Sequence, residues 1–403
     1  MTHIWARSFP DAARDLNGLE LEWLVVSGNG EESGHLVDAG ALDDLILPGA
    51  STLSVEPGGQ LELSSQPCAD LATLCAGLSE EVGALGAMVA ERRSRLLGMG
   101  LLAGRPAPRR LRTPRYDAMA EFFAADGPAG STMMTSSAAL QVNIGLGTGA
   151  QRQERWQRAH VLGPVLAAAF ANSPLAGGCP TGRMSNRLAV WSAIDRGRTA
   201  PVWRPGAGLE AWPAYVLDAR VMLIRRGAAD FAALGEVDLS FGRWLAQGHE
   251  LGYPTVEDLD YHLGTLFPPV RPKGWLELRY LDALPSPWWQ VAAAVTIGLV
   301  RHPEAGDRAE RAAAPFAHAW WLASLHGLGH PGLQRGAQAC FDAASEVMGE
   351  IGAGVQVADA VAEYAERFVS RSRTPADDRL DAFNRTGLPF LAEDAHLLVG
   401  SAR

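Results

Sequence analysis

Lysine is almost absent from this sequence: Lys273 is the only one among 403 residues, although lysine and arginine together number 35. A single lysine, with no Gly-Lys-Ser/Thr motif around it, excludes a phosphate-binding P-loop and the third-strand lysine of a protein kinase. A cofactor bound as a Schiff base would have to use Lys273. Any phosphate must therefore be bound by arginine, backbone amides or a metal ion.

Cysteine is scarce as well. The chain has four cysteines, which form neither a Cys-x-x-Cys pair nor a zinc-ligand spacing with histidine: Cys68, Cys75, Cys179 and Cys340. We expect all four to be reduced and mostly buried. Two other candidate metal groups fail on geometry. Asp258, Asp260 and His262 do not share one helical face, and glycine and proline break the helix that His326 and His330 would need. We interpret both groups as structural.

An excess of basic residues and long hydrophobic runs are also lacking. The formal net charge is -10 with no basic cluster among aromatics, which argues against nucleic acid as a partner. The longest apolar run, Val291 to Val300, is too short to cross a membrane, and the first 17 residues hold no apolar signal segment. We expect a cytoplasmic globular protein with no membrane partner; the oligomeric state is not indicated.

One short pattern occurs three times. Leu-Glu-Leu stands at 19–21, 61–63 and 276–278, with Glu22 two residues beyond the first glutamate and Arg279 two beyond the third. Side chains alternate across a strand, so each glutamate lies opposite an apolar face. If these strands are neighbours, Glu20, Glu22, Glu62 and Glu277 converge on one side of a sheet, an arrangement that requires a cation between them. Hard oxygen ligands in that number suit Mg²⁺, and the alternative is a set of solvent-facing strand residues.

The rest of the chain predicts a mixed architecture. We expect strands over 18–27, 58–65, 133–145 and 275–280, and helices over 70–97, 116–125, 151–171, from 254 onward and through most of 287–370. Gln141 and Asn143 share one face of the third strand, where they would bind substrate or satisfy buried backbone. Residues 174–187 form a loop carrying Arg183 and Arg187, and 267–272 are irregular. The prediction is one α+β domain over 1–403: sheet-rich 15–282, helical 283–371 and a C-terminal arm 372–403 over the surface.

An ordered set of motifs resembles one enzyme family. The set is Gly18-Leu-Glu-Leu-Glu-Trp23, Pro57-Gly-Gly-Gln-Leu-Glu-Leu-Ser64, Gln141-Val-Asn143, Phe170-Ala-Asn-Ser-Pro174 and Leu266-Phe-Pro-Pro-Val-Arg-Pro-Lys-Gly-Trp-Leu-Glu-Leu-Arg279. Over roughly residues 15 to 300 it is similar to the bacterial glutamate-cysteine ligases that supply γ-glutamylcysteine for ergothioneine synthesis. Two positions depart from the family pattern: Arg183 replaces a usual tryptophan, and Gly264 a usual threonine.

The resemblance implies a fold like the catalytic domain of glutamine synthetase, with a curved antiparallel sheet around a funnel for ATP, Mg²⁺ and the amino acids. It implies that Glu20, Glu22, Glu62 and Glu277 bind the metal and that Arg279 faces the γ-phosphate of ATP as catalytic and nucleotide-binding residue. Gln141, Asn143 and Arg187 are expected to bind substrate. The implied activity joins glutamate to cysteine through γ-glutamyl phosphate. The alternatives are a γ-glutamyl ligase for another amine and a non-catalytic nucleotide-binding homologue.

Overall fold

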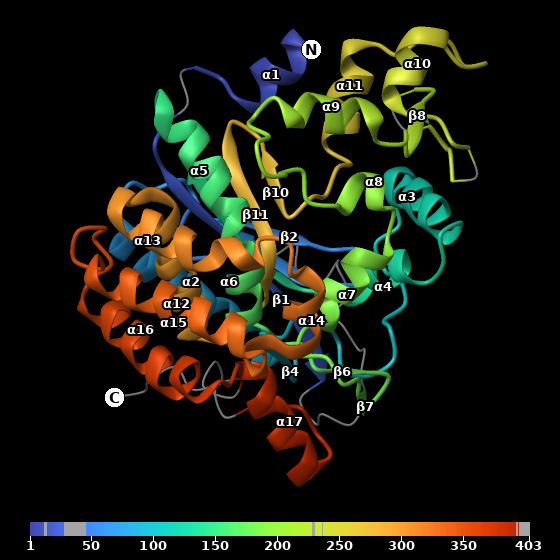
Figure 1. Cartoon of the computed structure of the whole chain (residues 1–403). Helices are drawn as coiled ribbons and strands as arrows, with labels where there is room; N and C mark the ends of the chain where they lie inside the picture. Colours follow the sequence, from blue (N-terminus) through green and yellow to red (C-terminus); the bar gives the residue numbers. More distant parts are fainter. Residues whose placement is uncertain (12–13, 28–45, 228–229, 236, 392–393, 395–403) are drawn as a thin grey trace.

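A seven-stranded antiparallel sheet forms the centre of the molecule (Figure 1). The computed structural model describes residues 1–11, 14–27, 46–227, 230–235, 237–391 and 394. The strand order is β10-β11-β5-β1-β3-β2, and β4 pairs with the end of β1. The strands are β1 (Asn17–Ser27), β2 (Thr52–Val55), β3 (Leu61–Ser64), β4 (Ser94–Leu97), β5 (Ala139–Gly145), β10 (Val270–Pro272) and β11 (Trp275–Asp282). The predicted α+β class with an antiparallel sheet is confirmed.

The sheet has one apolar face and one polar face, as the repeated Leu-Glu-Leu pattern predicts. Leu21, Leu63 and Leu278 are at most 3% exposed and belong to one hydrophobic cluster that extends to Tyr364 near the C-terminus. Burying each such leucine contributes about 1.5–3 kcal/mol. The apolar face therefore fixes the register of the strands, because a one-residue slip would bury the glutamates instead.

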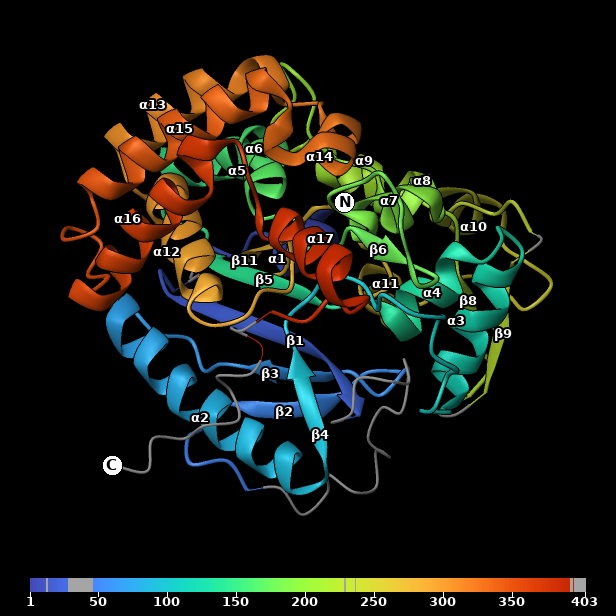
Figure 2. The ribbon, with the colours of Figure 1, turned by 90° about the horizontal axis from the view of Figure 1, so that it is seen from below.

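Two layers of helices cover the apolar face (Figure 2). The inner helices contact β5 or β11: α5 (Ala150–Val161), α6 (Gly163–Ala169) and α12 (Trp288–Arg301). Around them lie α13 (Pro303–Ala313), α14 (Trp320–His326), α15 (Pro331–Glu346) and α16 (Val355–Arg367), with three 3-10 turns, η2 (Ala314–Phe316), η3 (Gly327–Gly329) and η4 (Val369–Arg371). The helical region predicted for 287–370 is confirmed. That the whole chain is one domain stays a prediction.

Helix α2 (Leu71–Glu91) packs near the β4 end of the sheet and begins at Asp70, whose side chain accepts from the Thr73 amide at 2.7 Å. Among the described residues, α2 is the one helix long and apolar enough by composition to cross a membrane, and its face of leucines and valines is buried in the core. The predicted helix over 70–97 was too long. Arg93 has a φ of 53°, which ends the helix, and 94–97 form β4.

A second group of helices borders the polar face: α3 (Pro114–Ala124), α4 (Ala129–Ser136), α7 (Asn186–Ala193), α8 (Arg196–Thr199), α9 (Ala211–Asp218), α10 (Phe241–Gln247), α11 (Val256–Leu263) and α1 (Thr2–Ser8). Helix α11 starts at the capping box of Thr255 and Asp258, as expected from 254 onward. Two small hairpins join them, β6 (Leu175–Ala176) with β7 (Cys179–Pro180) and β8 (Leu223–Arg225) with β9 (Phe231–Ala233).

Three further local predictions were wrong. Residues 133–136 belong to helix α4, so the third strand starts only at Ala139. The helix predicted over 151–171 is divided into α5 and α6, because Pro164 at the start of α6 has no amide hydrogen for an unbroken helix. The segment expected to be irregular contains strand β10, which pairs with β11.

Of the predicted arm, Pro375–Thr386 form helix α17, while residues 392–393 and 395–403 lie outside the described part. Arg379 of α17 is fully buried and paired with Asp394.

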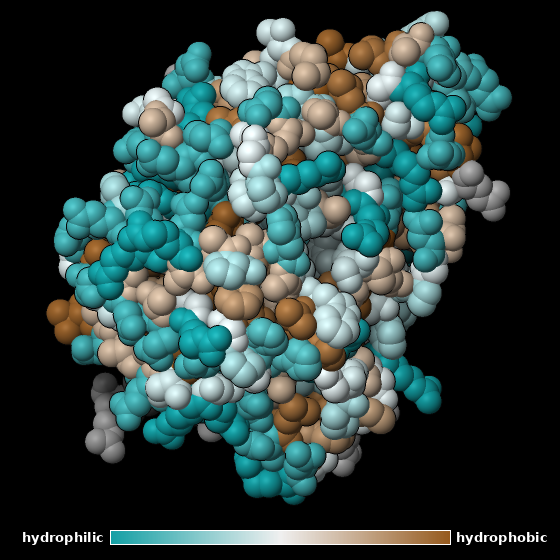
Figure 3. Space-filling model, viewed as in Figure 1, coloured by the Kyte–Doolittle hydropathy of each residue, from teal (hydrophilic) through white to brown (hydrophobic). Residues whose placement is uncertain are grey.

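Of the cysteines, Cys75 and Cys340 are buried, Cys68 is intermediate and Cys179 is exposed; all four are free thiols. On the face shown in Figure 3, hydrophobic residues occur in small groups among hydrophilic ones.

Candidate active site

The strand register brings the predicted site residues into neighbouring rows. Glu22 on β1 lies directly opposite Glu62 on β3, and Glu20 lies opposite Gln141 on β5. Asn143, two residues further along β5, lies opposite Glu277 on β11. All of these side chains belong to the polar face, so the sheet gathers them as the alternation predicts.

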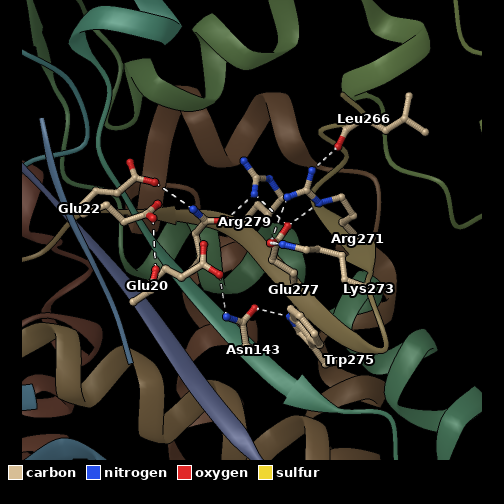
Figure 4. A network of polar contacts seen from close by, with 12 residues as sticks. Glu20, Glu22, Asn143, Leu266, Arg271, Lys273, Trp275, Glu277 and Arg279 are labelled. Atoms are coloured by element: carbon tan, nitrogen blue, oxygen red, sulfur yellow. Dashed lines mark hydrogen bonds and ion pairs between the residues drawn. The ribbon is translucent and has the colours of Figure 1, made fainter. Parts of the chain in front are cut away.

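Most of these side chains face a cavity of about 260 Å³ on the polar side of the sheet. Its lining includes Glu20, Glu22, Glu62, Glu277, Gln141 and Arg279. The other predicted residues, Asn143 and Arg187, are not part of the lining and lie next to it. Figure 4 shows the polar contacts that join Glu20, Asn143 and the β11 residues.

Glu277 is fully buried and surrounded by three cations. Its carboxylate accepts from Arg271 Nε at 2.6 Å, Lys273 Nζ at 2.9 Å and Arg279 Nη1 at 2.9 Å. Burial alone would raise the pKa of this carboxyl, but Arg271, Arg279 and Lys273 hold it well below its usual range. Glu277 is therefore ionised, and it orients all three cationic side chains at the floor of the cavity.

The remaining glutamates are held mainly by neutral donors. Glu20 Oε1 accepts from Asn143 Nδ2 at 2.9 Å, and Glu22 accepts from Gln141 Nε2 at 2.9 Å and from the Ala139 amide at 2.8 Å. Glu62 Oε1 accepts from the hydroxyls of Ser54 and Ser64, at 3.1 and 3.2 Å. Neutral donors orient these carboxylates without cancelling their charge.

Burial and the neighbouring charges shift the pKa values of Glu20 and Glu22. Burial, followed by repulsion from Glu62, raises the pKa of Glu22 to about 7. Burial and the charges of Glu277 and Glu62 also raise the pKa of Glu20. A further carboxyl, Glu56, joins the group: burial and the charges of Glu22 and Glu62 raise its pKa to about 8. Each of these carboxylates makes the ionisation of the others less favourable, and a bound cation would favour their ionised forms.

Glu56 is positioned by the tight turn before β3. Its amide donates to Gln60 O and its carbonyl accepts from the Gly59 amide, both at 2.8 Å. At Gly58 a β-carbon would stand 2.0 Å from the carbonyl oxygen of Thr135, so only glycine lets the turn approach α4 this closely. The Pro57-Gly58-Gly59 turn predicted from the sequence therefore also brings a carboxylate to the cavity.

Arg279 lines the same cavity as Glu56. Its Nη1 donates to Glu277 and to Gln141 Oε1, while its guanidinium lies 5.6 Å from the ring centre of Trp191 and 5.8 Å from that of Phe267. Aromatic faces and two fixed acceptors restrict the guanidinium to one orientation. Its Nε has no hydrogen-bond partner among the described residues.

Arg187 lies behind Arg279 and supports it. Arg187 Nη2 donates to the carbonyl of Arg279 at 2.8 Å, and its guanidinium lies 5.7 Å from the ring of Trp191. Within the described chain its Nε and Nη1 have no hydrogen-bond partner. Burial lowers its pKa, while Asp282 and Glu22 act in the opposite direction. Arg187 therefore retains donors for a further acceptor.

The sequence predicted Arg187 in a loop over 174–187, but it lies in the first turn of helix α7, because the Ser185 side chain caps that helix by accepting from the Leu188 amide. Buried Asp282 at the end of β11 fixes the segment that leads into α7. Asp282 accepts from the Asn172 amide at 2.8 Å, from Ser173 Oγ at 2.7 Å and from Ser185 Oγ at 2.9 Å. Burial raises its pKa, against the opposing effects of Arg187 and these donors. Of the two departures, Arg183 contacts Ser324 and is not in the cavity lining, whereas Gly264 is part of it.

Sequence reasoning missed several lining residues: Glu56, Arg115, Tyr116, Trp191, Arg271 and Lys273. A signal existed for two of them. Arg271 and Lys273 alternate along the chain six and four residues before Glu277, and the β10–β11 pairing places Arg271 directly opposite Glu277. Arg115, Tyr116 and Trp191 come from distant helices and have no local signature.

The donor set fits Mg²⁺ in chemical type. Glu20, Glu22, Glu56 and Glu62 are hard oxygen donors around one cavity, and two of them have strongly raised pKa values that a divalent cation would reverse. Within the described ranges, no group of three or more His, Cys, Asp or Glu side chains is close enough to hold an ion as it stands. Glu277, already bound to three cations, is the least available of the predicted ligands.

Comparison with known proteins identifies the family. Residues 16–372 match the model of glutamate-cysteine ligase family 2. The chain belongs to this family. It is 37% identical to glutamate–cysteine ligase EgtA of Mycolicibacterium smegmatis over 96% of this chain and 91% of that protein. It is 40% identical to EgtA of Mycobacterium tuberculosis, over 83% and 78%. The predicted resemblance to glutamate-cysteine ligases of the ergothioneine-pathway type is thus confirmed, and this family-2 chain is a ligase.

Solved structures agree on the fold of this family-2 ligase. The crystal structure of glutamate–cysteine ligase from Francisella tularensis in complex with AMP matches 97% of this chain and 88% of its own, with a TM-score of 0.56 at 13% identity. A bifunctional glutathione synthetase from Pasteurella multocida matches 95% of this chain and 51% of its own, with a TM-score of 0.52 at 14% identity. At these identities the likeness concerns the fold.

Proposed function

We propose that this family-2 ligase joins the γ-carboxylate of glutamate to the amine of cysteine, with conversion of ATP to ADP and phosphate, to supply γ-glutamylcysteine for ergothioneine synthesis. The observation that carries the proposal is one cavity in which four carboxylates, Glu20, Glu22, Glu56 and Glu62, face a fixed arginine, Arg279. Phosphoryl transfer requires positioning and charge neutralisation rather than a protein nucleophile. These residues provide both.

In the first step an oxygen of the glutamate γ-carboxylate forms a bond to the γ-phosphorus of ATP, and ADP leaves. Arg279 stabilises the charge on the transferred phosphoryl group, because its orientation is already fixed by Glu277 and Gln141. Arg187 has free donors beside this position, and we assign it, with Gln141 and Asn143, to the binding of the amino-acid substrate.

In the second step the cysteine amine attacks the acyl carbon, phosphate leaves, and the amine loses a proton to a base or to water.

Glu20, Glu22, Glu62 and Glu56 would hold Mg²⁺, with Glu277 as the fifth carboxylate of the set. When bound, Mg²⁺ supplies neutralisation of phosphate charge. The carboxylates themselves repel the anionic substrates and therefore make nucleotide binding depend on the cation.

We place the acceptor amino acid against the apolar part of the cavity lining. Met119, Met133, Met134, Trp191 and Phe267 contribute to its lining. Thioether and aromatic groups suit a small, polarisable, uncharged side chain such as a thiol. These residues favour cysteine over an acceptor with a charged side chain; the alternative remains a γ-glutamyl ligase for another amine. We place the enzyme in the cytoplasm, with glutamate, cysteine and ATP as its small-molecule partners.

The test combines purified protein with glutamate, cysteine, ATP and Mg²⁺ and measures ADP and γ-glutamylcysteine. Replacing cysteine by alanine, 2-aminobutyrate or lysine separates a thiol-tolerant apolar site from a general γ-glutamyl ligase. Hydroxylamine in place of the amine should trap the acyl phosphate as a hydroxamate. Absence of ADP release with every amine would refute the proposal, and nucleotide binding without turnover would instead support the non-catalytic alternative.

A further inference from the structure

We propose that Asp282, a buried carboxylate outside the cavity lining, is a positioning residue that holds Arg187 in place for a carboxylate of the amino-acid substrate. This inference rests on the proposed function, which assigns Arg187 to that substrate. Asp282 is 2% exposed and lies at the end of β11, on the same strand as Arg279. Because it does not line the cavity, its influence on a bound substrate must pass through another residue.

Arg187 has donors to offer but few contacts that fix them. The residue is 2% exposed, and its Nη2 donates to the carbonyl of Arg279 at 2.8 Å. Within the described chain its Nε and Nη1 have no hydrogen-bond partner. Buried donors without a partner point to an acceptor that the protein itself does not supply. Because so few contacts hold the guanidinium, its position depends on where the first turn of α7 places the Arg187 backbone.

Two serines connect Asp282 to that turn. Ser173 Oγ donates to Asp282 Oδ2 at 2.7 Å and accepts from the Arg187 amide at 3.2 Å. Ser185 Oγ donates to Asp282 Oδ1 at 2.9 Å and accepts from the Leu188 amide at 3.2 Å. A hydroxyl has one proton, so a carboxylate that accepts both protons leaves the serine lone pairs for the amides at the start of α7. The carboxylate thereby sets the direction of the hydrogen bonds at both serines.

The carboxylate is also fixed from its other side. The Asn172 amide donates to Asp282 Oδ2 at 2.8 Å, and Asn172 Oδ1 accepts from Nε of the fully buried Arg379 at 2.6 Å. At Gly100 a β-carbon would stand 2.4 Å from Asp282 Cγ, so glycine leaves the room that this side chain occupies. Asp282 is therefore held firmly enough to position the residues that it contacts.

The charge of Asp282 is matched to Arg187. Burial raises the pKa of Asp282, and the largest opposing effect is the charge of Arg187. Burial lowers the pKa of Arg187, and the largest opposing effect is the charge of Asp282. An asparagine could accept from two of the three donors without burying a charge, and a buried charge is costly. The carboxylate is thus explained by its attraction for Arg187 together with its hydrogen bonds.

The experiment measures glutamate affinity by calorimetry in the presence of Mg²⁺ and ADP, without an acceptor amine. For Asp282→Asn we expect glutamate affinity to fall about tenfold, because the new amide donates to one serine and loosens the start of α7. Affinity for ADP should stay within about twofold of the parent. In an Arg187→Lys background, where glutamate binding is already weakened, Asp282→Asn should change it by less than about twofold, because Asp282 acts through Arg187.

Two further variants accompany it, and urea unfolding establishes that each protein is folded. Ser173→Ala removes the hydroxyl between Asp282 and the Arg187 amide and should lower glutamate affinity about threefold, again without a further effect in the Arg187→Lys background. It decides the question if Asp282→Asn does not fold. Glu81→Gln is the matched control: Glu81 on α2 is 4% exposed and accepts from the Ser51 amide at 3.0 Å, outside the cavity lining. It should leave glutamate affinity unchanged even where it lowers stability.

Three results would overturn the inference. They are a glutamate affinity of Asp282→Asn equal to or above that of the parent, a loss that adds in full to the loss of Arg187→Lys, and an equal loss for ADP, which would indicate a general distortion of β11. A parent protein that binds no glutamate would refute the proposed function and this inference together, so the two kinds of failure are told apart by the parent alone.

Discussion

Replacing Glu62 by glutamine should stabilise the metal-free protein while impairing the enzyme. Glu62 and Glu22 face one another on adjacent strands, where side-chain β-carbons lie about 4.5–5.5 Å apart. If the two carboxylates keep the spacing of their β-carbons, their charges repel by about 3 kcal/mol at an effective dielectric constant of 20. At pH 8 in EDTA, above the pKa of about 7 of Glu22, we expect the free energy of unfolding of Glu62→Gln to exceed that of the parent by about 1–3 kcal/mol.

The same change removes an anionic oxygen donor. Glutamine still accepts from Ser54 and Ser64, so the strand contacts persist while the attraction for Mg²⁺ weakens. Activity at low Mg²⁺ should fall steeply and recover partly as Mg²⁺ is raised. Urea unfolding in EDTA and in excess Mg²⁺ measures the free energy of unfolding. ADP release against Mg²⁺ concentration measures the Mg²⁺ requirement of the activity.

Glu91→Gln is the matched control, because Glu91 is exposed at the end of α2 and the same change there should move neither quantity. The reasoning would be refuted by a Glu62→Gln protein that is no more stable than the parent in EDTA and works normally at low Mg²⁺. Higher stability with an unchanged Mg²⁺ requirement would leave the repulsion intact and remove Glu62 from the metal ligands.

Three other outcomes follow. Arg279→Lys keeps the charge but loses the fixed fork held by Gln141, so turnover should fall by about 10²–10³ with ATP binding nearly unchanged, and near-normal turnover would make the arginine structural. Asp394→Asn leaves Arg379 buried without its ion-pair partner, so urea titration should show a loss of about 3–5 kcal/mol; a loss below 1 kcal/mol would contradict this. Burial lowers the pKa of His262 to about 3, so its stabilisation is present above pH 6.5 and is lost as pH falls toward 3; His262→Gln should remove about 1.4 kcal/mol per pH unit from that slope, and an unchanged slope would exclude His262 as its source.

The sheet and half of the site could be predicted because their signals are local. Alternation at 19–22 and 276–279 assigns faces within a strand, and a buried apolar face leaves little choice of register. Helix starts were predictable for the same reason: Thr255 and Asp258 form their capping box within four residues. These features depend on spacing that a single segment contains.

The remainder depends on contacts between distant segments. Strand β4 exists because 94–97 pair with 24–27, and nothing within Arg92–Leu97 distinguishes that strand from a continued helix except the conformation of Arg93. Glu56 lies in the site because its turn packs against Thr135. Arg379 pairs with Asp394 where it also donates to Asn172, far away in the sequence. Such pairings are set by the packed fold, so composition and periodicity do not contain them.

The position of Lys273 has a practical consequence. It carries the one ε-amine of the chain, its side chain is 40% exposed, and it lies beside Glu277 in the lining of the cavity. Within this sequence, reagents that acylate amines can therefore react at the N-terminal amine and at Lys273, at the mouth of the site. Coupling the enzyme to a support or a dye through lysine would block catalysis in every molecule modified there, and the same selectivity makes Lys273 a single attachment point for a probe that reports on ligand entry.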